Sequence, residues 1–166
     1  PDGWPAKVPA GYTIGLADRQ DMYQLLKFSD RRDTLEELQE RFDRGEICVA
    51  AWKNGRVAAF TWAKLNNFTG AIYNIPLKGD EAYLFDAYTS KEHRGNRLAA
   101  HLRYNMYQVL AKRSRFVLYS TSNRYNTPAL KFKNKLGARI IHLVKCIDFF
   151  GRWKFGTSLR LQRLKE

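Results

Sequence analysis

The sequence predicts an α/β fold in which about four helices cover a mixed, mostly antiparallel sheet, and three observations support this. Asn54-Gly55 separates two strand-like runs, which is the strongest short signal for a β-hairpin. Residues 82–89, 97–112 and 116–121 alternate as strand, helix and strand, which predicts a central parallel βαβ unit. The apolar tail over 138–161 is interrupted by Phe150-Gly151-Arg152, which predicts a closing hairpin.

The 166 residues are enough for one domain over 1–166 with its own core. Residues 1–11 hold three of the five prolines and are expected to form an irregular lead-in before a first strand at 12–16. Asp18 is expected to cap a first helix. Asp33 or Thr34 is expected to cap a second one, which Gly45 ends.

The next strands, at 46–52 and 56–63, pair across the Asn-Gly turn, and residues 66–80 are expected to form a long loop that faces substrate. The strand at 116–121 is apolar enough to be buried on both faces, and the crossover to it should be right-handed. Thr127 is expected to cap a last helix with Pro128 in its first position and Gly137 after its end.

The formal net charge of +13 favours an anionic partner, such as nucleic acid, an acidic membrane face or a phosphate-rich small molecule. The basic residues are dispersed along the chain, which argues against nucleic acid. Cys48 and Cys146 lie in apolar stretches and are expected to be buried thiols in a reducing compartment, so we expect a cytoplasmic location. No apolar run approaches the length of about 18 residues that spans a bilayer.

The chemistry-bearing side chains suggest no metal site. His93, His101 and His142 are scattered without carboxylate or thiol partners at ligand spacing, and are expected to serve surface or packing roles. The closing hairpin over 138–161 either completes the sheet or buries a homodimer contact.

A glycine turn connects the strand at 82–89 to the following helix. A strand that ends in Arg94-Gly95-Asn96 and runs into a helix aims free backbone N–H groups and the positive end of the helix dipole at one spot. Arg94 and Arg97 add charge there. We therefore expect a diphosphate to bind over residues 94–99.

Two stretches carry a family resemblance that extends from about Tyr12 to Leu161. Arg94-Gly-Asn-Arg-Leu-Ala99 resembles the pyrophosphate loop of the GNAT acetyltransferase superfamily, Gln/Arg-x-x-Gly-x-Gly/Ala, with Arg97 in place of a glycine. The stretch from Asn126 to Gly137 resembles the second signature, Asn-x-x-Ala-x-x-Phe, which ends in Leu-Gly. The resemblance implies a GNAT-like fold for the mixed sheet.

The resemblance further implies an N-acetyltransferase that moves an acetyl group from acetyl-CoA to a primary amine by direct attack in a ternary complex, without a metal. The acceptor is a small amine, an amino sugar or a protein amine. Two alternatives stay open: a CoA-binding module without catalysis, which Arg97 and Lys133 would favour, and a basic protein that binds nucleic acid or an acidic surface.

In this family the strand before the loop carries a bulge, and its backbone binds pantetheine. The resemblance assigns the cofactor to three groups of residues. The backbone of Ala87, Tyr88 and Thr89 binds pantetheine, the loop Arg94, Gly95, Asn96, Arg97, Leu98 and Ala99 holds the pyrophosphate, and Asn126, Phe132 and Lys133 lie along the outer arm. Lys133 stands where the family often has a tyrosine that protonates the leaving thiolate.

An amine acceptor must lose its proton before it attacks, which calls for a base. Asp86 stands in the middle of an apolar strand, where we expect burial to raise its pKa and make it that base. Its alternative role is a structural carboxylate paired with an arginine. Glu81 is a weaker second candidate base. Tyr125 is a candidate acid, with packing as its alternative role.

One backbone conformation is also predicted. A positive φ at Arg97 would cost about 1–2 kcal/mol, so we expect an ordinary helical conformation there.

Overall fold

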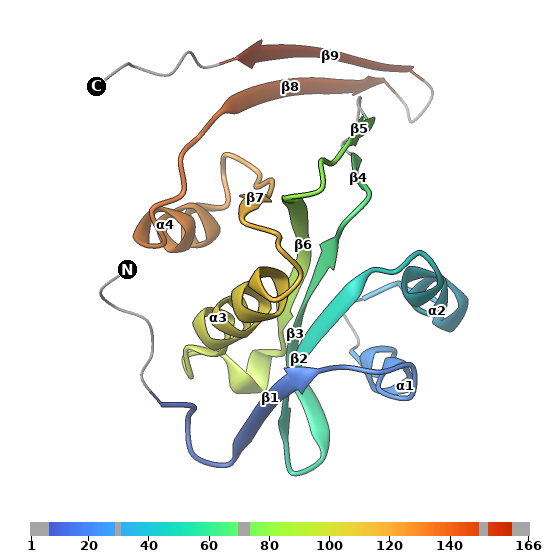
Figure 1. The fold of residues 1–166 in the computed structure, drawn as a ribbon, viewed down its shortest axis with the longest axis vertical. Coiled ribbons are helices and arrows are strands. Elements are labelled where there is room, and N and C mark those ends of the chain that lie inside the picture. Colours follow the sequence, from blue (N-terminus) through green and yellow to red (C-terminus); the bar gives the residue numbers. More distant parts are fainter. Residues whose placement is uncertain (1–6, 29–30, 70–73, 150–152, 161–166) are drawn as a thin grey trace. The chain divides into compact units, whose positions relative to one another are not determined.

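The computed structural model describes residues 7–28, 31–69, 74–149 and 153–160 (Figure 1). The chain forms two compact units, which are described separately. The larger unit runs to Asn67 and continues from Leu77 to Thr121. The smaller unit contains Phe68–Pro76 and the chain from Ser122 onward.

The larger unit is built on a five-stranded sheet. Its strands are β1 (Tyr12–Leu16), β2 (Ile47–Lys53), β3 (Arg56–Lys64), β6 (Glu81–Thr89) and β7 (Val117–Tyr119), in the order β1-β2-β3-β6-β7. Neighbours are antiparallel except β6 and β7, which are parallel. This confirms the predicted mixed sheet, with its parallel pair at one end of the strand order.

The β2–β3 hairpin is confirmed as well. Asn54 and Gly55 have φ values of 51° and 73°. A type I′ turn requires positive φ at both central residues, and it matches the twist of the flanking strands.

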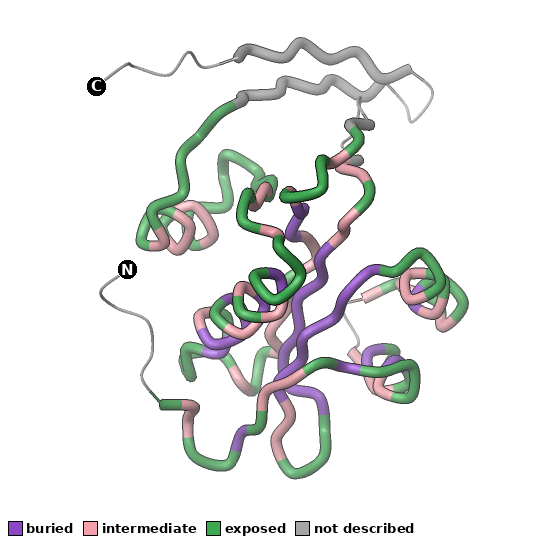
Figure 2. Tube along the Cα trace, viewed as in Figure 1, coloured by how far each residue is buried: buried purple, intermediate pink, exposed green. Residues whose placement is uncertain are grey.

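Helices cover both faces of this sheet (Figures 1 and 2). α3 (Leu98–Ala111) packs on one face through Leu98, Leu102, Met106 and Leu110, which recur every fourth residue and are at most 2% exposed. α1 (Met22–Leu25) and α2 (Leu35–Asp43) cover the other face, where Met22, Leu25 and Leu38 pack with Phe60 and Trp62.

The observed N-caps of the first two helices agree with the predicted ones only in part. Thr34 caps α2 in a capping box with Glu37, as predicted. Asp18, however, does not cap α1, whose N-cap is Asp21. The carboxylate of Asp18 instead accepts hydrogen bonds from the N–H groups of Gln20 (2.8 Å) and Asp21 (3.1 Å), which closes the turn that precedes the helix.

The prediction that the strand at 116–121 is buried on both faces is wrong. Phe116 is 69% exposed and Val117 39%, because β7 is the end strand of the described sheet. Its register joins only three residue pairs, from Glu81–Val117 to Tyr83–Tyr119. In the described sheet, the rest of β6 is therefore paired with β3 alone.

The remaining elements are β4 (Asn67–Thr69), β5 (Asn74–Pro76), α4 (Thr127–Lys135), β8 (His142–Phe149) and β9 (Trp153–Arg160). β4 and β5 form a two-stranded sheet, so the segment 66–80 is not the continuous loop that the sequence predicted. β8 and β9 pair antiparallel, which confirms the closing hairpin, although its turn, 150–152, lies outside the described residues.

The last helix begins one residue earlier than predicted. Its N-cap is Asn126, whose Oδ1 accepts a hydrogen bond from the N–H of Ala129 (3.2 Å). Thr127 is therefore the first helical residue and Pro128 the second, where proline's missing N–H costs nothing. Gly137, with φ 71°, follows the helix end as expected.

Candidate functional site

A β-bulge interrupts β6 in its second half. Phe60 of β3 pairs with Tyr88, but Trp62 pairs with Phe85, so Asp86 and Ala87 together stand opposite one residue of β3. Asp86 has a φ of 46°. A bulge bends the strand and leaves backbone groups of the extra residue unpaired, so β6 has the distortion that the family resemblance implied.

Asp86 is held by two arginines, one from the α1–α2 connection and one from α2. Arg31 donates from Nη1 and Nη2 to the two carboxylate oxygens of Asp86, both at 2.8 Å. Arg41 of α2 donates to Oδ2 at 2.5 Å. Asp33 pairs with both guanidinium groups, so two acids and two bases form one neutral cluster.

The cluster is packed against aromatic rings as well. The guanidinium carbon of Arg31 lies 4.8 Å from the ring centroid of Phe60, and that of Arg41 lies 5.1 Å from Trp62. Only 13–19% of each of the four charged side chains is exposed. The cluster thus fixes the bulge to α2 and to the segment before it.

The predicted rise in the pKa of Asp86 is wrong. Burial raises the pKa of this carboxyl, but the hydrogen bonds and charges of Arg31 and Arg41 outweigh burial, and the pKa is lowered. The structure therefore matches the alternative that the sequence offered, a carboxylate paired with arginine. Its role as a base stays a prediction without the pKa argument that motivated it.

The loop after β6 leaves a run of backbone donors free. Within the described chain, the N–H groups of the five residues from Gly95 to Ala99 donate no hydrogen bond. Asn96 donates from its side chain to the carbonyl of His93 (3.1 Å), and Arg94 donates from Nε to the carbonyl of Thr89 (3.2 Å). These contacts hold the loop folded at the N-terminus of α3.

Arg97 departs from its predicted conformation. It has φ 55° and ψ 19°, in the left-handed region, whereas the sequence analysis expected a helical conformation. The reason is that α3 begins only at Leu98, so Arg97 is the N-cap and still belongs to the turn. Arg97 therefore adopts a φ region that glycine enters more readily than other residues.

This loop fits a diphosphate. Free N–H groups in a turn with residues of positive φ form an anion-binding concavity, and the helix N-terminus adds a positive partial charge. A Cβ built on Gly95, which has φ 84°, would meet no atom within 4 Å, so the space above the loop is open. In the part of the chain that the structure describes, no three His, Cys, Asp or Glu side chains are grouped for a metal ion.

A cavity of about 550 Å³ adjoins the end of β6 in the larger unit. It is lined by the end of α1, the start of β3 and residues of the segment 88–93. His93, which the sequence assigned to a surface or packing role, lines this cavity, and its Nδ1 is hydrogen-bonded to the hydroxyl of Tyr12 (2.9 Å). No sequence signal links these two residues, which are 81 positions apart.

The other predicted site residues belong to the smaller unit. Asn126 is the N-cap of α4, and Phe132 and Lys133 are half-buried on that helix. Tyr125 is 82% exposed, with the guanidinium of Arg124 lying 5.5 Å from its ring centroid. Their roles toward a cofactor stay predictions.

Two further predicted groups have clear environments. Glu81 accepts a hydrogen bond from the N–H of Lys78 (2.8 Å) and one from the hydroxyl of Tyr119 (3.0 Å), which lower its pKa. Cys48 is buried, and burial raises the pKa of its thiol, as expected for an unreactive structural cysteine. Cys146 lies in β8, where side chains are outside the described set.

Comparisons with known proteins agree with the geometry. A family model described as the acetyltransferase (GNAT) family matches residues 16–138. A search of curated protein sequences gives no significant match. Within the described chain, no helix combines the length and apolar character needed to cross a membrane.

Solved structures with the same fold have low sequence identity. A ribosomal-protein-alanine N-acetyltransferase from Brucella melitensis matches with a TM-score of 0.59 and 16% identity, over 78% of this chain and 93% of that one. A Trypanosoma brucei acetyltransferase matches with a TM-score of 0.59 and 15% identity, over 78% of this chain and 93% of that one. An aminoglycoside acetyltransferase from an uncultured soil metagenomic sample matches with a TM-score of 0.60 and 17% identity, over 78% of this chain and 92% of that one.

Proposed function

Because the chain belongs to the GNAT acetyltransferase family over residues 16–138, we propose that it transfers an acetyl group from acetyl-CoA to a primary amine. The observation that carries this proposal is the loop Arg94–Ala99, where five consecutive free N–H groups lie at a helix N-terminus. Such a loop suits the diphosphate of CoA. The bulged strand that leads into it supplies the backbone for the pantetheine arm.

In the proposed reaction the amine nitrogen attacks the thioester carbon in a ternary complex. A C–N bond forms and the C–S bond breaks, while the amine gives up a proton and the departing thiolate takes one. Backbone N–H groups at the bulge, near Ala87 and Tyr88, would stabilise the negative charge that develops on the carbonyl oxygen. Acetyl-CoA supplies the activated acyl group.

Asp86 is assigned a positioning role in this proposal. Its contacts with Arg31 and Arg41 hold the bulge in a φ region that few non-glycine residues adopt, so the backbone groups next to it are fixed before substrate binds. Tyr125 remains the candidate for the acid that protonates the thiolate.

The acceptor belongs to one of the amine classes that the family uses. The structural neighbours named above include an aminoglycoside acetyltransferase and a ribosomal-protein-alanine N-acetyltransferase. These names support a small amine, an amino sugar or a protein amine as acceptor.

The cytoplasmic location that the sequence analysis expected stays a prediction.

Calorimetric titration with acetyl-CoA and with CoA tests the proposal at Gly95. Gly95→Trp places a large side chain in the open space above the loop, and we expect it to weaken CoA binding by at least about 50-fold. Gly95→Ala is the matched control, because it carries the same strain at positive φ, about 1–2 kcal/mol, without the bulk. Alanine should leave CoA binding within a few-fold of wild type.

Two results would contradict the proposal in different ways. Equal CoA affinity in wild type and in a folded Gly95→Trp variant would show that the cofactor does not lie on the loop. Tight CoA binding without acetyl transfer to any amine in a broad panel would identify a CoA-binding module without catalysis.

A further inference from the structure

Three cations line the cavity at the end of β6 without an acidic partner. They are Lys27 just after α1, Arg56 at the start of β3 and Lys91 in the 3-10 helix η1 (Lys91–His93). None of them forms an ion pair with an acid in the part of the chain that the structure describes. One carboxylate, that of Glu92, also lines the cavity, so the lining carries an excess of positive charge.

This arrangement differs from that of other cations around α1 and α2. Arg19 pairs with Asp43, Arg44 pairs with Glu40 and Glu46, and Arg31 and Arg41 pair with Asp86 and Asp33. These four arginines are therefore neutralised within the described chain, whereas the cavity cations, like Arg32 on the α1–α2 connection, have no ion pair there. Unpaired cations from three separate elements around one concave space attract an anionic group.

A further polar group and an aromatic wall complete the cavity. The Oγ of Ser90 is buried and has no hydrogen-bond partner within the described chain. Such a group costs free energy unless a ligand or water satisfies it. Phe28 and Tyr88, with ring centroids 4.9 Å apart, form the apolar wall on the side of the bulged strand.

We propose that this cavity binds the acceptor through an acid group, so that the acceptor is an amine that also carries a carboxylate or a phosphate. This inference rests on the proposed acetyl transfer, because it places the amine toward Tyr88, which follows the bulge, and the acid group toward Lys27, Arg56 and Lys91. An acceptor whose only charges are positive is repelled by the same cations.

Matched pairs of amines isolate the acid group. Phenylalanine and phenylalanine amide differ only in a carboxylate, and O-phosphoethanolamine and ethanolamine differ only in a phosphate. Initial rates of CoA release give kcat and KM for each. We expect kcat/KM to be at least about tenfold higher for the acid member of one pair, since each nearby cation changes its binding by roughly that factor. The pair that responds shows whether carboxylate or phosphate is preferred.

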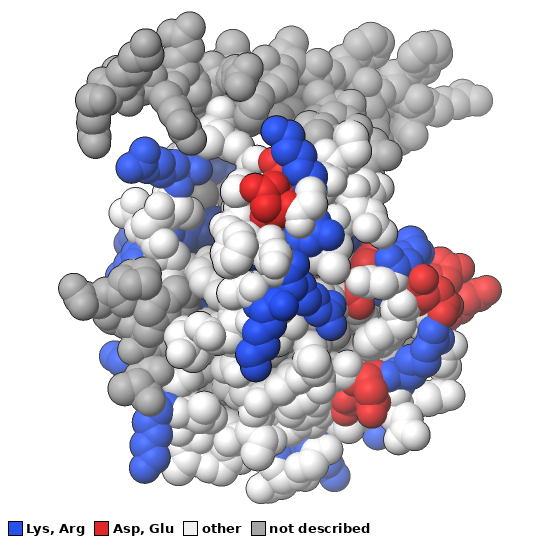
Figure 3. Space-filling view, viewed as in Figure 1, with Lys and Arg blue, Asp and Glu red and all other residues white. Residues whose placement is uncertain are grey.

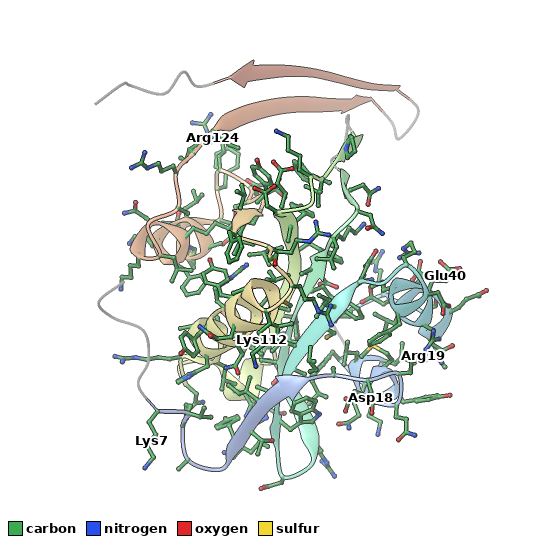
Figure 4. The ribbon with its side chains drawn as sticks, viewed as in Figure 1. Lys7, Asp18, Arg19, Glu40, Lys112 and Arg124 are labelled. Atoms are coloured by element: carbon green, nitrogen blue, oxygen red, sulfur yellow. The ribbon has the colours of Figure 1, made fainter. Side chains whose placement is uncertain are left out.

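Charge-reversal variants link the preference to the cavity. Lys27→Glu combined with Arg56→Glu should raise KM for the acid acceptor at least about tenfold, and it should lower the ratio of kcat/KM between the acid and the neutral member of the pair by a similar factor. Lys112→Glu is the control, because it makes the same charge reversal as each of these two substitutions but at a site away from the cavity lining. Lys112 projects from the C-terminal end of α3, where basic side chains gather on the face shown in Figure 3, and it is labelled in Figure 4.

The outcomes separate this inference from the proposed function. Acetylation of both members of each pair at equal efficiency, or preference for the neutral members, would overturn the acid-binding cavity and leave acetyl transfer intact. Calorimetry with CoA present provides the second readout. Binding of an acid amine that the double variant abolishes, without CoA release from acetyl-CoA, would overturn acetyl transfer alone. Binding of neither amine, or competition of the acid with CoA, would overturn the cavity assignment.

Discussion

Two residues hold a positive φ in the candidate site without being glycine, and each is stabilised differently. Asp86 has φ 46° at the bulge, where two arginines fix its carboxylate. Arg97 has φ 55° and an exposed side chain that makes no hydrogen bond or ion pair within the described chain. Strain that nothing in the fold offsets is typical of a position that serves a ligand, and Arg97 has a guanidinium to offer to a diphosphate.

Arg97→Gly should raise the free energy of unfolding by about 0.5–1 kcal/mol, because glycine relieves the strain of positive φ at some entropic cost. Arg97→Ala keeps the strain and removes the guanidinium, so it separates the two effects. Chemical denaturation measures stability, and calorimetry measures CoA affinity, which both variants should reduce. A glycine variant that is less stable than the alanine variant would contradict this account.

At the scale of elements, α2 connects local sequence to the site. Its capping box at Thr34 and Glu37 satisfies backbone N–H groups at the helix start, and Asp33 precedes it directly. In its last turn the helix presents Arg41 to Asp86. The acidic side chains of α2 face solvent beside Arg19, with Glu40 and Arg19 labelled in Figure 4.

Thr34→Ala should lower the free energy of unfolding by about 1 kcal/mol, the usual cost of a lost N-cap. Thr34→Ser retains the accepting oxygen and should stay within about 0.5 kcal/mol of wild type. Urea denaturation followed by circular dichroism measures both. Equal losses in the alanine and serine variants would show that the threonine methyl group, and not the cap, stabilises the helix.

At the scale of the whole molecule, the cluster of Asp86, Arg31, Arg41 and Asp33 couples stability to pH. The pKa of Asp86 is lower in the folded protein than in an unfolded chain, where it is near 3.9. Its contribution to stability is therefore complete above the unfolded pKa, and it is lost as the pH falls through the folded pKa.

The prediction of one domain over 1–166 remains open to test by the same unfolding experiments.

Asp86→Asn should lower the free energy of unfolding at pH 7 by about 1–3 kcal/mol, because it leaves two half-buried guanidinium groups with Asp33 alone. The difference from wild type should shrink as the pH falls below about 4. Asp43→Asn, which breaks the exposed pair with Arg19, is the control and should change stability by less than about 1 kcal/mol. A difference for Asp86→Asn that is constant from pH 7 to pH 3 would contradict the assignment.

Local patterns alone determined much of this protein. The Asn-Gly hairpin, the Thr34 cap and the every-fourth-residue stripe of α3 depend on neighbours in sequence. The alternation of strand, helix and strand predicted the parallel pairing of β6 with β7, and the loop motif at 94–99 indicated the family. Tertiary structure decided the rest. Arg31 and Arg41 reach Asp86 across 55 and 45 residues and reverse its expected pKa shift. The exposure of β7 follows from its place at the sheet end. The charged cavity exists only because three separate elements meet there, and contacts between residues distant in sequence leave no local pattern to read.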